Sequence, residues 1–119
     1  AEVRAATNAN GIDPVGFNGY EPTCFAAEAS DEEARNSVAQ LADFNRYSAK
    51  THSGIWRDLA VRKRATEIDN QIAIIAELAA EKGVETPAIR RLVELIHDIE
   101  EGHREQSIET FDALLEVCR

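Results

Sequence analysis

Apolar residues recur at three- and four-residue intervals through most of this chain, which is the spacing of one face of an α-helix. The spacing is clearest in two stripes of the second half: Ile68, Ile72, Ile75 and Ala79, then Ile89, Leu92, Val93, Ile96 and Ile99. No stretch alternates apolar and polar residues over the length of a strand. The sequence therefore predicts an all-α protein, a helical bundle.

Capping residues mark the ends of the helices in this half. The first stripe belongs to a helix predicted over 66–82, and Gly83 follows where a left-handed residue is needed. Thr86 and Pro87 predict the N-cap and first turn of the next helix, which ends near Gly102. A last helix is predicted after a cap at Ser107, with Phe111, Leu114 and Leu115 as its apolar residues.

The first half predicts shorter or less regular elements. Residues 1–10 resemble the end of a helix, and 11–29 form a loop for which packing by Phe17, Tyr20 and Phe25 is favoured over a functional role. Ser30 and Glu33 make a capping box, so a helix begins there and runs to about Tyr47. Its predicted buried face consists of Ala34, Val38, Leu41 and Phe44.

A bend is expected near residues 50–54, followed by a short amphipathic helix that carries Ile55 and Leu59. Basic residues are interleaved with it: Arg57, Arg62, Lys63 and Arg64. Such a run is typical of a solvated, salt-bridged face, although bidentate arginine contacts with a substrate carboxylate or a cofactor phosphate remain an alternative.

Length and charge limit the class of protein. The 119 residues are enough for one domain, predicted over 1–119, and the net charge of −9 argues against nucleic-acid binding. No apolar run is long enough to span a membrane and no signal peptide opens the chain, so we expect a cytoplasmic protein. Because the chain starts at Ala1, inside an apparent helix, we expect it to be the C-terminal part of a longer protein.

Metal and thiol chemistry find little support in the sequence. The histidines, His52, His97 and His103, lack the spacing of a metal site, and we expect surface or helix-edge positions for them. Cys24 and Cys118 are far apart, so free thiols are favoured over a disulfide. No glycine-rich phosphate loop follows a strand, and this domain therefore cannot bind a dinucleotide by itself.

The stretch over residues 50–69 is the unusual one, because it gathers polar residues around one short helix and the start of another. Glu67 lies at a predicted helix N-terminus, where the helix dipole stabilises its charge. From the residues alone, Glu67 is most simply a helix-start charge.

The same stretch carries a combined motif. It consists of Ser53-Gly54-Ile55-Trp56-Arg57-Asp58, the basic spacer, Thr66-Glu67-Ile68-Asp69 and then Gly83-Val84-Glu85-Thr86-Pro87. In this order the segments resemble the C-terminal domain of the ketopantoate reductase (2-dehydropantoate 2-reductase) family, over roughly residues 50–100. The resemblance implies the fold of the helical substrate and dimerisation domain of 6-phosphogluconate-dehydrogenase-like two-domain oxidoreductases.

The resemblance also implies a function in pantothenate biosynthesis. An N-terminal Rossmann domain, absent from this chain, would bind NADPH, and the helical domain would close over a small 2-oxo acid. The whole protein would form a homodimer, and this fragment would not be active alone. Glu67 matches the family's glutamate near the substrate and nicotinamide. Ser53 and Gly54 match its substrate-binding serine pair, with one hydroxyl lost, so a substrate other than ketopantoate stays open.

No catalytic residue is assigned. The family's catalytic lysine precedes the start of this chain, so neither Lys50 nor Lys63 takes that role. The alternative hypothesis is a non-catalytic interaction or dimerisation module, in which the apolar faces of 67–82 and 86–101 pair with another copy.

Overall fold

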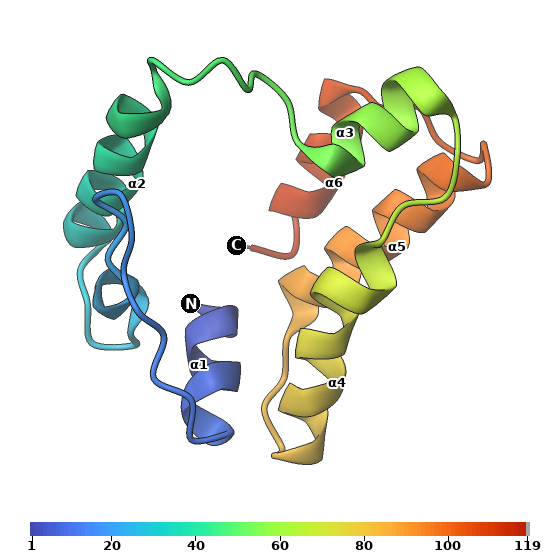
Figure 1. Cartoon of the computed structure of the whole chain (residues 1–119). Coiled ribbons are helices and arrows are strands. Elements are labelled where there is room, and N and C mark those ends of the chain that lie inside the picture. The colour runs from blue at the N-terminus through green and yellow to red at the C-terminus, as the bar shows by residue number, and fades with distance from the viewer. Residues whose placement is uncertain (119) are drawn as a thin grey trace.

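A computed structural model describes residues 1–118 of the chain, as helices joined by turns and loops (Figure 1). The α-helices are α1 (Glu2–Ala9), α2 (Asp31–Asn45), α3 (Gly54–Arg57), α4 (Ile74–Glu81), α5 (Pro87–Glu100) and α6 (Ile108–Leu115). A 3₁₀ turn, η1 (Pro22–Phe25), and two π-helical turns, η2 (Asp58–Arg62) and η3 (Asp69–Ala73), complete the elements. Since these 118 residues contain no strand, the all-α prediction is confirmed.

The core lies where α1, α4 and α5 meet, with η2 and η3 above it. Ile68 and Leu95 are each 2% exposed, and Ala79 is fully buried. The remaining buried apolar residues are Ala6, Leu59, Ala76 and Ile89. Helix periodicity identified the buried faces only in part: Ile68, Ala79 and Ile89 of the predicted stripes are buried and their other members are half-buried. The buried residues Ala76 and Leu95 lie outside both predicted stripes.

The start of the helix predicted over 66–82 differs from the prediction. Helical structure begins at Ile68 with the π-helical turn η3, and the α-helix proper starts only at Ile74. The amide of Thr66 donates to Glu100 Oε1 at 2.6 Å, and Thr66 Oγ1 accepts from the Ile68 amide at 3.2 Å. Because these contacts hold Thr66 outside the helix, the first turn starts later. Gly83 ends the helix with φ of 72°, as predicted.

The N-terminus of α5 is capped by a residue from the other end of the chain. Thr86 occupies the predicted N-cap position, but its hydroxyl is buried and has no hydrogen-bond partner among the described residues. The Glu2 carboxylate accepts instead from the amides of Ala88 and Ile89, both at 2.8 Å. Predicting Thr86 as the side-chain cap was therefore wrong, since a carboxylate of α1 already satisfies the free amides.

Helix α2 begins at the predicted capping box. Glu33 Oε2 accepts from the Ser30 amide at 2.8 Å, and Ser30 Oγ accepts from the Glu33 amide at 3.2 Å. The hydrogen bond from the Ser30 amide lowers the pKa of the Glu33 carboxyl.

The predicted buried face of α2 is wrong at Val38 and Phe44, whereas Ala34 and Leu41 are half-buried. Val38 is 51% exposed and Phe44 is 58% exposed, whereas Ser37 is buried and its Oγ accepts from the Glu21 amide at 2.8 Å. The reason is that α2 packs chiefly against η1 and stands apart from α3, α5 and α6 (Figure 1). The part of its apolar stripe formed by Val38 and Phe44 consequently lacks a partner within the described chain.

The loop over 11–29 is ordered by its aromatic residues, as predicted. The ring of Tyr20 lies between those of Phe17 and Phe25, with centroids 5.4 Å and 5.1 Å away. Gly19, with φ of 85°, lets the loop approach α2, since a Cβ there would lie 2.8 Å from Gln40 Cβ. Cys24 and Cys118 are free, which confirms the preference for thiols.

Residues 1–118 expose more surface than a compact monomer does. The accessible surface is 8433 Å², whereas a folded chain of 13.1 kDa exposes about 6,400 Å². The radius of gyration is 15.3 Å, against about 13.5 Å for a compact chain of this length. Exposed apolar residues contribute on α2, α4 and α6: Val38, Phe44, Ile74, Leu78, Ile108 and Phe111. None of the described helices is long and apolar enough to cross a membrane.

The Glu2 cap predicts a stability effect. Replacing Glu2 by Ala leaves two amides at the start of α5 without their acceptor, so we expect the free energy of unfolding to fall by about 1–2 kcal/mol. Urea denaturation followed by circular dichroism measures the loss. Glu28→Ala, at an exposed glutamate in a turn, is the control and should be neutral. Equal stability of the two variants would contradict a capping role for Glu2.

Candidate functional site

A cleft of about 380 Å³ lies where the start of α3 faces the start of the η3–α4 helix. The residues that line it are Lys50, Ser53, Gly54, Ile55, Asp58, Glu67 and Gln71. The structure thus brings together Ser53, Gly54 and Glu67, the residues that the sequence singled out, although up to fourteen positions separate them. The volume suits a small organic molecule.

Ser53 holds the start of α3. Its Oγ accepts a hydrogen bond from the Trp56 amide at 3.0 Å, which is the N-cap contact. A serine hydroxyl can donate and accept at once, so the capping bond leaves the Ser53 O–H free to donate to a molecule in the cleft. Trp56 itself stacks on His52, with ring centroids 3.7 Å apart.

Gly54 leaves the wall of the cleft open. A Cβ built at this position meets no atom within 4 Å, and its φ lies outside the left-handed region. Neither a tight contact nor backbone conformation therefore requires glycine here. The missing side chain enlarges the cleft and removes one place for a hydroxyl.

Glu67 immediately precedes the first helical turn, as predicted, and is exposed. Its Oε2 accepts from Gln71 Nε2 at 2.8 Å, an i,i+4 contact along the helix. A carboxylate has about four acceptor positions, so Glu67 retains the capacity to accept from a ligand hydroxyl.

Asp58 is the buried acid of the cleft. Its Oδ1 accepts from Arg62 Nη1 and Arg64 Nε, both at 2.9 Å. The hydrogen bonds from Arg64 and Arg62 hold the pKa of the Asp58 carboxyl below its ordinary value. These contacts support the salt-bridged interpretation of the basic run for Arg62 and Arg64, whose guanidinium groups are already engaged.

The second wall of the cleft is fixed to α5 by two contacts. The Thr66 amide donates to Glu100 Oε1 at 2.6 Å, and His97 Nε2 lies 3.0 Å from Asp69 Oδ1. Glu67 lies between Thr66 and Asp69, so its backbone is held on both sides. His97 is half-buried and His52 and His103 are exposed, which agrees with the positions expected for the histidines.

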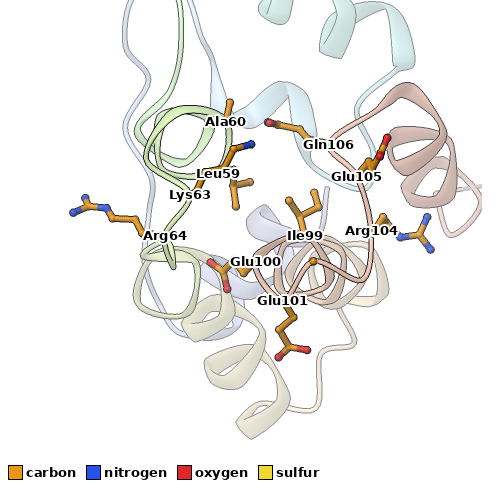
Figure 2. Close-up of a pocket in the computed structure, with 11 residues that line it drawn as sticks. Leu59, Ala60, Lys63, Arg64, Ile99, Glu100, Glu101, Arg104, Glu105 and Gln106 are labelled. Carbon is orange, nitrogen blue, oxygen red and sulfur yellow. The ribbon is translucent and has the colours of Figure 1, made fainter.

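A larger cavity of about 650 Å³ lies between η2, the end of α5 and the loop that leads to α6. Figure 2 shows Leu59 and Ile99 near its centre, while the guanidinium groups of Arg64 and Arg104 point away from it. Three glutamates line it, Glu100, Glu101 and Glu105, and Glu100 is engaged with Thr66. It includes none of the predicted site residues, so we take the smaller cleft as the candidate site.

Comparison with protein families identifies the relatives of this chain. The family model described as "Ketopantoate reductase PanE/ApbA C terminal" matches residues 1–100. The chain belongs to this family. Neither the curated proteins nor the solved structures gave a match.

The family match is longer than the stretch in which the motifs were found. The motifs indicated this ketopantoate reductase family over roughly 50–100, whereas the match also includes α1, the aromatic loop and α2. Helix α6 lies beyond it. All three predicted site residues of this family member fall inside the matched range.

Sequence reasoning missed two polar residues of the cleft. Gln71 could have been found, because it lies four positions after Glu67 on a predicted helix and so on the same face. Lys50 lies in the segment between α2 and α3, where no periodicity indicates which way a side chain points. Only the tertiary structure brings it to the cleft.

The Asp58 ion pairs predict a pH dependence of stability. Because the pKa of folded Asp58 lies below its ordinary value of 3.8, its charge stabilises the fold above that pH. The stabilisation is lost as the pH falls through the pKa of the folded state. We expect Asp58→Asn to lower the urea midpoint at pH 7 and to differ little from wild type near about pH 2.

Asp43→Asn is the matched control, since Asp43 pairs with Arg46 on the exposed surface of α2. Exposed pairs contribute little, so its urea midpoint should follow that of the wild type at both pH values. An Asp58→Asn deficit that persists unchanged at low pH would show that packing, and not the charge, is responsible.

Proposed function

We propose that this chain is the substrate-binding helical domain of an NADP-dependent 2-dehydropantoate 2-reductase-like oxidoreductase that reduces a 2-oxo acid. The observation that carries the proposal is the convergence of Ser53, Gly54 and Glu67 on one cleft. Family membership supports it. An N-terminal Rossmann domain would complete the protein, which we expect to act in the cytoplasm in pantothenate biosynthesis.

The residues of the cleft suit two different ends of a ligand. The free O–H of Ser53 can donate to a substrate carboxylate, and Glu67 can accept from a hydroxyl of the substrate or of a ribose. NADPH, bound mainly by the Rossmann domain, would supply the hydride that reduces the ketone to an alcohol. The helical domain would contribute orientation, since reaction requires the ketone carbon to be held close to the hydride.

We assign the proton donor of the reaction to none of the 119 residues. Reduction places a hydride on the ketone carbon and a proton on its oxygen, and we expect the donor to lie outside this helical domain. Because we expect neither the donor nor a dinucleotide-binding loop within this helical domain, we expect it to be inactive by itself.

The unpartnered surface supports association with other chains or domains. About 2,000 Å² of surface beyond that of a compact monomer is comparable to a stable protein interface. We propose that the Rossmann domain and a second copy cover parts of it, in a homodimer. The same surface favours the second candidate, a non-catalytic interaction or dimerisation module, which requires no cleft chemistry.

Glu67 separates the two candidates. In the full-length protein, NADPH oxidation with ketopantoate should fall about 100-fold in kcat/KM for Glu67→Ala, equivalent to about 2.7 kcal/mol of transition-state stabilisation. Glu81→Ala, at an exposed glutamate near the end of α4, is the control and should keep the wild-type rate. Equal turnover of all three proteins would make Glu67 a helix-start charge. No turnover in the wild type would favour the interaction module.

Gly54 provides a test of the substrate. Because a side chain at this position meets open space, Gly54→Ser should fold normally and add a hydroxyl donor to the cleft. If ketopantoate is the substrate, we expect its KM to fall up to about tenfold, the effect of one hydrogen bond. Gly54→Ala controls for bulk. Weaker ketopantoate use in both variants would indicate that the natural substrate needs the space that glycine leaves.

A further inference from the structure

The candidate cleft contains one cation that no carboxylate neutralises. Of its two acids, Asp58 is bound by two arginines and Glu67 by the Gln71 amide. Lys50 lines the same cleft, is exposed, and forms no salt bridge within residues 1–118. Residues 1–118 therefore present a free ammonium group at a cleft in which Asp58 is paired with two arginines, while Glu67 keeps its charge because its partner is a neutral amide.

Ser53 lines the cleft together with Lys50. Lys50 lies three residues before Ser53, in the segment that leads into α3, and both residues line the cleft. The Ser53 O–H is free to donate, because the capping bond uses the oxygen only as an acceptor. An ammonium and a hydroxyl together form a site for a carboxylate, which accepts charge-assisted hydrogen bonds.

The arginines that were candidates for this role are less suitable. Arg62 and Arg64 are bound to Asp58, and neither they nor Arg57 line the cleft. Turning Arg62 or Arg64 toward a ligand would leave the buried Asp58 carboxylate with one partner fewer, which is unfavourable. Binding an anion at Lys50 breaks no existing ion pair.

We infer that Lys50 binds the carboxylate of the ligand, with the Ser53 hydroxyl, and makes the cleft selective for 2-oxo acids over uncharged ketones. The inference rests on the proposed function, because it takes a 2-oxo acid as the ligand. Lys50 is then a specificity-determining residue, separate from the proton donor. The charge of Lys50 binds the carboxylate in place of a hydrogen bond from a second hydroxyl at position 54.

Binding to the 119-residue chain tests the inference without the cofactor. The probes are 3-methyl-2-oxobutanoate and its uncharged methyl ester, titrated while the amide resonances of Gly54 and Glu67 are followed by NMR. We expect the wild type to bind the acid more tightly than the ester. In Lys50→Gln, the Kd of the acid should rise about tenfold while that of the ester stays unchanged.

Two further variants keep the result interpretable. Lys63→Gln removes a lysine that lines the larger cavity instead, and it should bind both probes as the wild type does. Lys50→Arg keeps the charge and should retain most of the affinity for the acid. Raising the salt concentration should weaken acid binding in the wild type and leave Lys50→Gln nearly unaffected. Circular dichroism checks that each variant is folded.

The outcomes separate the two proposals. If Lys50→Gln and Lys63→Gln bind the acid equally, or if the wild type binds acid and ester equally, the role of Lys50 is overturned. The proposed function is then tested by the NADPH oxidation assay alone. If neither probe shifts the Gly54 and Glu67 resonances of the wild type, the cleft is not a 2-oxo acid site, which overturns both.

Discussion

The hydrogen bond from the Thr66 amide to the Glu100 carboxylate joins the start of one helix to the end of the next. A carboxylate on a backbone amide is a charge-assisted contact, stronger than the usual hydrogen bond between neutral groups. It determines where the helix containing α4 begins, and therefore where Glu67 lies. The same two helices each contribute a buried apolar residue, Ile68 and Leu95, both 2% exposed. The candidate cleft depends on this contact for one of its walls.

Electrostatic contacts in the other wall are arranged around a single buried acid. Asp58 forms ion pairs with Arg62 and Arg64, two of the four basic residues that follow α3 or lie within it. These two arginines therefore stabilise the local structure. Without such pairing, a buried carboxylate would be costly. A consequence is that the run contributes little free positive charge to the cleft, whereas Lys50, from a segment without helical structure, contributes one full charge.

The remaining constraint is the apolar surface that the described residues leave exposed to solvent. Helix α2 stands apart from α3, α5 and α6 (Figure 1). Its apolar residues Val38 and Phe44 are more than half exposed. A hydrophobic face of this kind is stable when another surface covers it. A domain that works by closing against a nucleotide-binding domain needs such a surface, and so does a dimerisation module. The fold thus suits both proposed functions, and the chemistry of the cleft has to distinguish them.

The sequence by itself determined the helical class, part of the apolar faces of α4 and α5, and several helix ends. These features are local: periodicity selects a face within one helix, and Ser30, Gly83 and Ser107 act within one turn of their own position. The motif also selected Ser53, Gly54 and Glu67 as site residues, and the family to which the chain belongs agrees with that motif.

Tertiary structure decided the contacts between residues distant in sequence. Glu2 replaces Thr86 as the cap of α5 across 86 positions, and Thr66 is kept out of its helix by Glu100. The solvent-facing stripe of α2 likewise follows from which elements pack on it, since a stripe indicates a face to be buried but not whether this chain supplies the partner. Lys50 in the candidate site is a further example. It lies in a segment without helical periodicity, so only the folded chain determines that it borders the cleft.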